Sequence, residues 1–273
     1  MLRSRFLHKI TAYCFGLLAI VQGALAAELV MSNSNYPPYI YNDDSDQVGA
    51  VDLIIERVVH DAGHSLKKRD IPFLRSLNMM KDGSLDLKQM IFMKPERAEY
   101  INYVSVPIVF ESIVLFKNKH RQDVPTEFPI ADLDSYLVGV IRGKSYGDYW
   151  DQMLLQRVTI DIEKQALRML ESGRIDYLIG DYAQTFYQAK EEQLVDMLAV
   201  VTNAGHSTPD YIGVSRHTPN HQRIVADLTR ALVTFKQTDE FHAILKAYNL
   251  PPATFADTYA DTYAETPSGS PSP

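Results

Sequence analysis

Short apolar runs and amphipathic segments alternate along the chain between residues 28 and 250. Runs rich in Val, Ile and Leu predict β-strands, and segments whose apolar residues recur every three to four positions predict helices. The predicted strands cover residues 28–33, 64–71, 85–93, 109–116, 137–141 and 212–215. The predicted helices cover residues 49–62, 74–82 and 220–247, together with a segment that starts near residue 147. Strands that alternate with helices are typical of an α/β fold with a mostly parallel sheet.

One helix-to-strand motif occurs twice. Residues 77–87 (LNMMKDGSLDL) align with residues 167–178 (LRMLESGRIDYL), and the matched positions include the glycines 83 and 173 and the aspartates 86 and 176. Each copy is typical of a helix that ends at a glycine and leads into a short strand. Chance is the alternative, because a glycine and an aspartate after a helix are common. The number of matched positions favours two similar α/β lobes.

The predicted domain organisation follows from this duplication. Residues 27–116 and 211–250 are expected to form lobe 1, and residues 117–210 to form lobe 2, which begins with a polar linking segment. Ligands of open α/β sheets bind outside the carboxyl ends of the strands, so two facing lobes predict a cleft between them.

Both ends of the chain differ from this body. The first 26 residues combine Arg3, Arg5 and Lys9 with an apolar run and the small residues Ala24-Leu25-Ala26, which is the pattern of a cleavable signal peptide. An uncleaved membrane anchor is the alternative, although the apolar run is shorter than the roughly 20 residues that span a bilayer. Residues 251–273 are rich in Pro, Ser, Thr and Tyr and predict a flexible tail. We therefore expect a periplasmic protein.

The composition narrows the functional class. The 273 residues include 27 Lys and Arg against 34 Asp and Glu, so a nucleic-acid partner is not expected. Cys14 is the only cysteine, which excludes an intrachain disulfide and a cysteine-ligated metal site. His60 and His64 are separated by Gly63, which should end the helix, and the chain has neither a G-x-S-x-G nor an H-E-x-x-H motif. We therefore expect no metal, no cofactor and no enzymatic activity.

Arg97 is the first candidate for ligand binding. It lies in MKPERAEY, after an apolar strand and a proline, where the strand ends and a helix begins. A guanidinium at that place can bind a carboxylate through two parallel charge-assisted hydrogen bonds. The alternative is an exposed arginine that pairs with Glu96 or Glu99.

The segment IRGKSYG (141–147) is a second candidate. Gly143 permits a tight turn, and Ser145 together with free backbone N–H groups at a helix N-terminus can bind an anion. Arg142 and Lys144 add positive charge. The segment lacks the Walker pattern, so nucleotide binding is not implied, and an ordinary β–α turn is the alternative.

A carboxylate and a tyrosine loop complete the candidate site. Asp181 ends the predicted strand IDYLIGD and can accept hydrogen bonds from an ammonium group, although it can equally cap the following helix. Tyr36 lies in NYPPYIY (35–41), whose rings can form a stacking wall or a cation–π contact. A surface loop of tyrosines is the alternative.

At these positions the chain resembles the family 3 extracellular solute-binding proteins, which serve polar amino-acid ABC transporters. The resemblance covers most of residues 28–250 and rests on NYPPYIY, GAVDLIIERVV, LRSLNMMKDGSLD, PERAEYINYVSVP, VGVIRGKSYG and GRIDYLIGD. It implies the two-lobed periplasmic-binding-protein fold of type II, in which two crossing strands join α/β lobes that close on the ligand. It also implies that Arg97 binds the ligand α-carboxylate, that Asp181 binds the α-ammonium, that Ser145 lies beside the second-lobe anion site, and that Tyr36 forms the aromatic wall.

The chain departs from the family pattern just before Arg97. Members that bind amino acids usually have Ser or Thr at the places where this chain has Phe92 and Lys94, so the pocket wall is expected to be more apolar and more basic. The segment PFLRS also brings Arg75 near the cleft, as in a subgroup of stand-alone members. The expected ligand is an amino acid or a related carboxylate or zwitterion.

Three functions are compatible with this resemblance. The first is a periplasmic binding protein that delivers its solute to an inner-membrane ABC permease. The second is a sensory protein that signals to a membrane partner such as a kinase or cyclase. The third is an enzyme that resembles the cyclohexadienyl dehydratases, which needs a pocket carboxylic acid that stays protonated. Glu96 and Glu111 are the candidates for that acid, and no feature of the sequence indicates a shifted pKa for either.

Overall fold

The computed structural model describes residues 26–42 and 44–250. The predicted signal peptide and the predicted tail lie outside these residues, apart from Ala26. The strands are β1 (Glu28–Asn33), β2 (Ser65–Asp70), β3 (Leu87–Phe92), β4 (Ile101–Tyr103), β5 (Val109–Asn118), β6 (Leu137–Ile141), β7 (Gln156–Ile160), β8 (Tyr177–Asp181) and β9 (Leu198–Ser215). The helices are α2 (Ala50–Asp61), α3 (Phe73–Asp82), α4 (Pro95–Ala98), α5 (Asp148–Asp151), α6 (Glu163–Glu171), α7 (Tyr182–Glu191), α8 (His221–Phe235) and α9 (Asp239–Ala247), with short 3-10 helices η1 (Ile130–Ser135) and η2 (Val195–Met197). None of the helices in the described ranges is long and apolar enough to cross a membrane.

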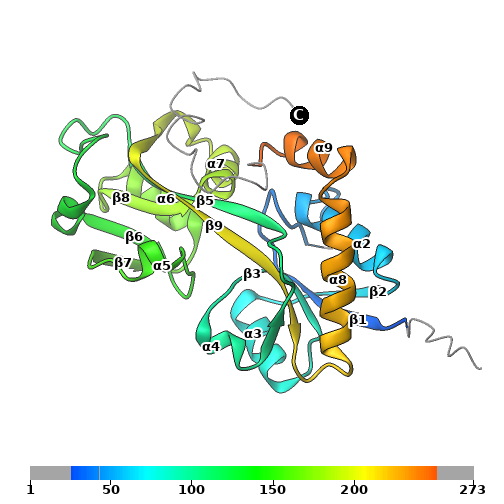
Figure 1. Cartoon of the computed structure of the whole chain (residues 1–273). Helices are drawn as coiled ribbons and strands as arrows, with labels where there is room; N and C mark the ends of the chain where they lie inside the picture. The colour runs from blue at the N-terminus through cyan, green and yellow to red at the C-terminus, as the bar shows by residue number, and fades with distance from the viewer. Residues whose placement is uncertain (1–25, 43, 251–273) are drawn as a thin grey trace, which may run out of the picture.

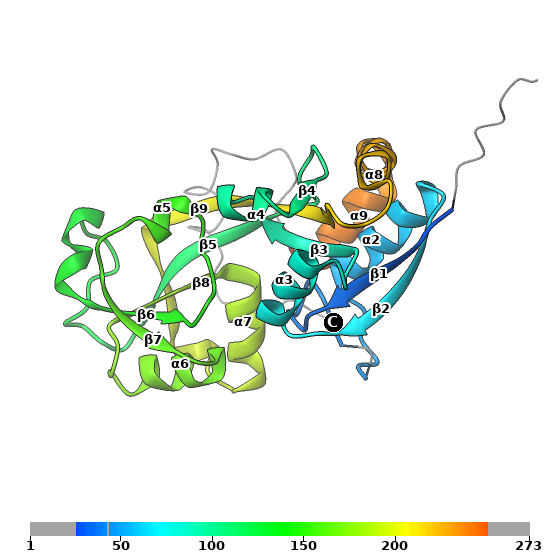
Figure 2. The same ribbon diagram turned by 90° about the horizontal axis from the view of Figure 1, so that it is seen from below.

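Two strands cross between the lobes. The sheet has the order β2-β1-β3-β9-β5-β8-β6-β7, and β4 pairs with β9. The strands β1, β2 and β3 run parallel in lobe 1, and β6, β7 and β8 run parallel in lobe 2. The antiparallel pair β5 and β9 is shared by both lobes, with Val109 opposite Asp210 at one end and Asn118 opposite Leu198 at the other. Figures 1 and 2 show this pair running from one lobe to the other, which confirms the two-lobed fold.

Each lobe has its own hydrophobic core. In lobe 1, the helices α2 and α8 bury residues such as Ile54 and Leu228 against the sheet, as their three-to-four-residue spacing predicts. In lobe 2, Leu167 of α6 is fully buried in one cluster and Trp150 of α5 in another. Separate cores allow the lobes to move as two bodies about the crossing strands.

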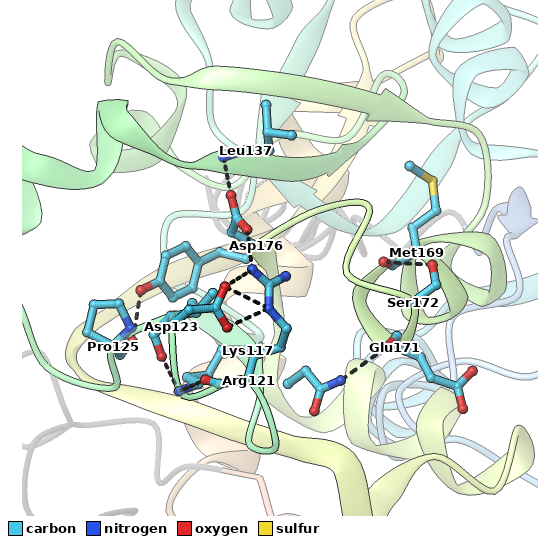
Figure 3. Close-up of polar contacts among 12 residues, drawn as sticks. Lys117, Arg121, Asp123, Pro125, Leu137, Met169, Glu171, Ser172 and Asp176 are labelled. Carbon is cyan, nitrogen blue, oxygen red and sulfur yellow. Dashed lines mark hydrogen bonds and ion pairs between the residues drawn. The ribbon is translucent and has the colours of Figure 1, made fainter.

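The repeated motif has the same structural role in both lobes. The carboxylate of Asp86 accepts a hydrogen bond from the backbone N–H of Val30 at 2.9 Å, where β1 begins. The carboxylate of Asp176 accepts one from the backbone N–H of Leu137 at 2.9 Å, where β6 begins (Figure 3). Gly83 and Gly173 have φ values of +80° and +72° and follow the helices α3 and α6. The matched aspartates therefore join each motif to the neighbouring strand, which supports the inferred duplication.

Replacing Asp176 by alanine is expected to lower the free energy of unfolding by about 1–3 kcal/mol, because the N–H of Leu137 loses its acceptor and Arg121 loses a partner at 3.2 Å. Asp123 is a matched control, since its more exposed carboxylate also pairs with Arg121 (Figure 3). Urea unfolding followed by circular dichroism measures both variants. Equal stability losses in Asp176→Ala and Asp123→Ala would contradict the structural role of the repeated aspartate.

Two predicted elements differ from the structure. The last strand was expected only at residues 212–215, whereas β9 begins at Leu198. Its first part contains Gly205, Pro209 and several polar residues, so it lacks an apolar alternation, and its strand conformation comes from pairing with β5 along its length. The predicted helix 220–247 is two helices, α8 and α9. They are separated at Thr238, whose hydroxyl accepts from the N–H of Phe241 and caps α9.

Candidate functional site

Six charged side chains from both lobes influence one another electrostatically near the crossing strands. Five of them are at most 8% exposed, and Lys144 is half-buried. We call them the interlobe cluster: Lys88 of β3, Arg97 of α4, Glu111 of β5, Lys144 of the loop after β6, Asp181 of β8 and Asp210 of β9. Buried charges are costly unless they are paired or hydrogen-bonded, so such a concentration is typical of a functional site.

Arg97 and Lys88 form the lobe 1 side of the cluster. Pro95 starts the short helix α4, and Arg97 Nη1 donates to the carbonyl oxygen of Phe92 at 3.2 Å. The Arg97 guanidinium lies 5.8 Å, and Lys88 Nζ 4.9 Å, from the centre of the Phe73 ring. Burial lowers the pKa of Lys88 to about 8, and the charge of Arg97 adds to this effect. Arg97 is therefore a buried cation, and the alternative of an exposed arginine is wrong.

Asp181 belongs to lobe 2 and contacts lobe 1. Its carboxylate caps α7 by accepting from the N–H of Gln184 at 2.8 Å, and it also accepts from the N–H of Ser112 at 2.9 Å. The hydroxyl of Tyr39 donates to it from lobe 1 at 3.0 Å. Burial raises the pKa of Asp181, and these hydrogen bonds oppose the rise. The two predicted roles, helix cap and interlobe carboxylate, therefore coexist in one residue.

The tyrosine loop packs into the space between the lobes. The rings of Tyr36 and Tyr39 stack with centres 5.5 Å apart, and Tyr39 is fully buried, so the loop is not a surface loop. Gly49 explains the tight packing, because a Cβ atom there would lie 2.1 Å from the carbonyl oxygen of Tyr39. Lys144 Nζ donates to the hydroxyl of Tyr36 at 2.7 Å and lies 4.6 Å from the centre of its ring. The loop therefore places one tyrosine against each charged lobe 2 side chain of the cluster.

Ser145 binds a carboxylate of the protein itself. Its hydroxyl donates to Asp151 Oδ2 at 2.5 Å, and the N–H of Tyr146 donates to Asp151 Oδ1 at 3.0 Å. From lobe 1, Lys94 Nζ donates to Asp151 Oδ2 at 2.7 Å. Burial would raise the pKa of Asp151, but the hydrogen bonds from Lys94, Ser145 and Tyr146 lower it overall. The anion-binding groups predicted in this loop thus hold Asp151, which the sequence reasoning missed although it follows the loop by one helical turn.

Of the remaining predicted ligand-binding residues, two are exposed and two lie where the lobes touch. Arg142 is exposed and pairs with Asp161 at 2.7 Å, and Arg75 is exposed on α3, so the structure brings neither into the interlobe cluster. Gly143 has a φ of +74°, and a Cβ atom there would lie 3.1 Å from Leu74 of lobe 1. Phe92 is buried and packs with core residues of lobe 2. Gly143 and Phe92 therefore lie where the lobes touch.

The sequence analysis named Glu111 only as a candidate acid for an enzyme and missed Asp210, and both are buried in the crossing strands. Burial raises the pKa of both carboxyl groups, and the nearby carboxylate of Asp181 adds to the rise. The expectation that nothing shifts the pKa of Glu111 is therefore wrong. The sequence feature that could have indicated a buried carboxyl group is Glu111 itself, a single acidic residue inside the apolar run VFESIVLF.

Replacing Lys94 by methionine is expected to weaken ligand binding by up to about 1 kcal/mol, about fivefold, because the Lys94–Asp151 pair joins the lobes but is only partly buried. Isothermal titration with the solute found by the screen described below measures this. Arg230→Met is a matched control, since Arg230 pairs with Asp227 on the same helix, away from the cluster. An unchanged affinity in Lys94→Met would show that this pair does not contribute to closure.

The fold and the site together define a class of protein. The protein has two α/β lobes that are joined by two crossing strands, and charged side chains of both lobes lie between them. This is the architecture of type II periplasmic binding proteins. The chain belongs to the bacterial extracellular solute-binding proteins, family 3, whose model matches residues 29–251. Proteins of this family bind small solutes. A search of curated proteins found no match.

Solved structures of low sequence identity share the fold. A histidine kinase sensor domain with similarity to periplasmic binding proteins is 20% identical with a TM-score of 0.68, and the match covers 81% of this chain and 95% of that chain. An ancestral arginine-binding protein bound to arginine is 17% identical with a TM-score of 0.66, covering 82% and 98%. The substrate-binding protein of an amino-acid ABC transporter is 12% identical with a TM-score of 0.63, covering 82% and 99%.

Proposed function

We propose that the protein binds a zwitterionic solute, an amino acid or a close relative, in the periplasm and delivers it to an inner-membrane ABC transporter. The observation that carries the proposal is that a buried arginine of lobe 1 and a buried carboxylate of lobe 2 belong to one electrostatically linked interlobe cluster. Arg97 binds the α-carboxylate, and Asp181 binds the α-ammonium. Periplasmic export by a cleaved signal peptide agrees with the family of extracellular solute-binding proteins.

Binding is coupled to closure of the lobes. Arg97 and Lys88 belong to lobe 1, whereas Asp181 and Lys144 belong to lobe 2, so a solute that contacts both sets favours the closed arrangement. The contacts of Tyr39 with Asp181 and of Tyr36 with Lys144 also join the lobes and complete the wall around the solute. A ligand shifts such an equilibrium by its difference in affinity for the two states. Open and closed proteins then present different surfaces to a membrane partner.

Sensing is the second candidate function. The same site would serve it, and the similarity to a histidine kinase sensor domain supports it, as the similarity to a transporter substrate-binding protein supports delivery. Uptake of the labelled solute by cells with and without the gene separates the two. Loss of uptake in the deletion strain indicates delivery, whereas normal uptake with a lost transcriptional response to the solute indicates sensing.

One observation supports a dehydratase-like enzyme, because burial raises the pKa of Glu111 and so favours the protonated form of this carboxyl group. We propose binding rather than catalysis, since Glu111 neighbours Asp210 in the interlobe cluster and lies on a strand shared by both lobes. Incubation with prephenate or arogenate, followed by product analysis, tests the enzyme directly. Turnover abolished in Glu111→Gln would replace the binding proposal.

A thermal-shift screen tests the proposed function. The set contains amino acids, oligopeptides and small organic acids, each at several concentrations. A true ligand at about 100 times its dissociation constant stabilises the folded protein by about 2.7 kcal/mol, and the stabilisation grows with the logarithm of its concentration. Stabilisation by an amino acid that Arg97→Ala abolishes supports the proposal. Stabilisation only by compounds without an α-carboxylate and an α-ammonium contradicts it.

A further inference from the structure

Three buried polar side chains are neighbours on the crossing strands. Glu111 of β5 lies directly opposite Thr208 of β9, and Asp210 follows two residues later on β9. Side chains of opposite residues on paired strands lie on the same face, and so do those of residues two apart on one strand. All three side chains therefore lie on one face of the two-stranded ribbon that β5 and β9 form. Their exposed fractions are 5%, 8% and 2%, respectively. We call these three residues the crossing-strand acceptors.

Each of these residues has an oxygen atom that lacks a hydrogen-bond partner among the described residues. These atoms are Glu111 Oε2, Thr208 Oγ1 and Asp210 Oδ2. A buried polar atom without a partner is unfavourable by roughly 1–3 kcal/mol, and native proteins rarely leave several together. Three such atoms on one face of the ribbon therefore indicate a group that donates hydrogen bonds at this place.

The cations nearest to the two carboxyl groups have other partners. Lys88 Nζ donates to the hydroxyl of Ser34 at 3.3 Å, and Lys144 Nζ donates to the hydroxyl of Tyr36. In the described part of the chain no basic side chain lies within ion-pairing distance of Glu111 or Asp210. The two carboxyl groups are neighbours, and burial raises the pKa of both, to about 8 for Asp210, so Asp210 carries a proton at neutral pH.

We propose that the crossing-strand acceptors bind a cationic end group of the solute, so that the ligand is a basic amino acid with an ammonium or guanidinium side chain. This inference rests on the proposed function, in which Arg97 and Asp181 hold the α-carboxylate and the α-ammonium. A cationic group donates several hydrogen bonds to the converging oxygens and supplies the positive charge that both ionised carboxylates need. The protons that these carboxyl groups carry pass to the solvent when the cationic group binds.

Matched ligand pairs test the charge requirement without any mutation. Arginine and citrulline have similar shapes, as do lysine and norleucine, but only the first of each pair carries the cationic group. Isothermal titration of the full chain at pH 7 should give at least about tenfold tighter binding for one cationic member than for its neutral partner. Titration in two buffers of different ionisation enthalpy should show proton release for the cationic member only.

Variants of the crossing-strand acceptors test whether these residues cause the preference for the cationic ligand. Glu111→Gln and Asp210→Asn keep the side-chain shapes and should reduce the preference for the cationic ligand to less than about threefold. Asp161→Asn is the control, because Asp161 lies on the surface of lobe 2 and pairs with Arg142. Thermal unfolding of each variant without ligand shows whether it is folded. If a variant is not folded, the matched ligand pairs on the unchanged protein still decide the question.

Each outcome has a distinct meaning. Equal or tighter binding of citrulline and norleucine, lost in Arg97→Ala, overturns this inference and leaves the proposed function intact. Binding of agmatine or cadaverine, lost in Glu111→Gln, while no α-amino acid binds, overturns the proposed function and supports the cationic subsite. Failure of all these amines and amino acids overturns both.

Discussion

Arg97→Ala is expected to weaken ligand binding by about 2–5 kcal/mol, which corresponds to a factor from about thirty to several thousand. The effect is large because Arg97 is buried, is oriented by the carbonyl group of Phe92, and lies over the ring of Phe73. If Arg97 binds the ligand carboxylate as proposed, its loss leaves that carboxylate without its main partner among buried side chains. Isothermal titration with the ligand from the thermal-shift screen measures the change.

Two further substitutions make this result specific. Arg97→Lys keeps the charge but loses the two parallel hydrogen bonds, so it should recover only part of the affinity. Arg142→Ala removes an exposed arginine of the same predicted set and should bind like the unaltered protein. If all three proteins have the same affinity, the assignment of the carboxylate site to Arg97 is wrong.

Asp181→Ala should reduce both stability and binding. We expect a loss of about 2–4 kcal/mol in the free energy of unfolding, because the buried N–H groups of Ser112 and Gln184 lose their acceptor and α7 loses its cap. The affinity should fall at least about a hundredfold, because closure then leaves the ligand ammonium without a carboxylate. Urea unfolding and isothermal titration measure the two effects separately.

The two effects can be separated by comparison with a second helix cap. Asp181→Asn keeps an oxygen that can accept from Gln184 but removes the charge, so it should lose less stability than the alanine variant while still binding weakly. Thr238→Ala removes the cap of α9, away from the interlobe cluster, and should lower stability by about 1 kcal/mol with no change in affinity. A normal affinity in Asp181→Asn would show that the ligand does not need this charge.

The sequence predicted the elements that follow from local periodicity. The strands β1 and β6 and the helices α2 and α3 agree with their predicted ranges to within one residue, because each combines a regular apolar spacing with clear end signals. The repeat predicted two lobes for a physical reason that the structure supplies, since Asp86 and Asp176 bind backbone N–H groups near the starts of the neighbouring strands β1 and β6. The length of β9 could not be predicted, because its strand conformation depends on pairing with β5.

The candidate site was predicted only in part, for a related reason. Asp181 ends β8 and Arg97 lies in the short helix that follows β3, and such positions can be recognised from the order of elements along the chain. Asp151 and Asp210 owe their places to contacts between segments far apart in sequence, which no local pattern reveals. Ser145 and Arg142 have the expected residue types, but a neighbouring Asp151 or Asp161 binds each of them.

The path of the chain through the two lobes also constrains how the protein is assembled. Lobe 2 is inserted between the crossing strands β5 and β9, and β3 lies between β1 and β9 in the sheet. While the polypeptide emerges from a ribosome or a translocation channel, β3 therefore has an open edge until residues 198–215 arrive. Lobe 2 has most of its strands earlier and can fold first. Final assembly of lobe 1 is thus a late event, and a chaperone that shields this edge would act on a chain that has not yet supplied β9.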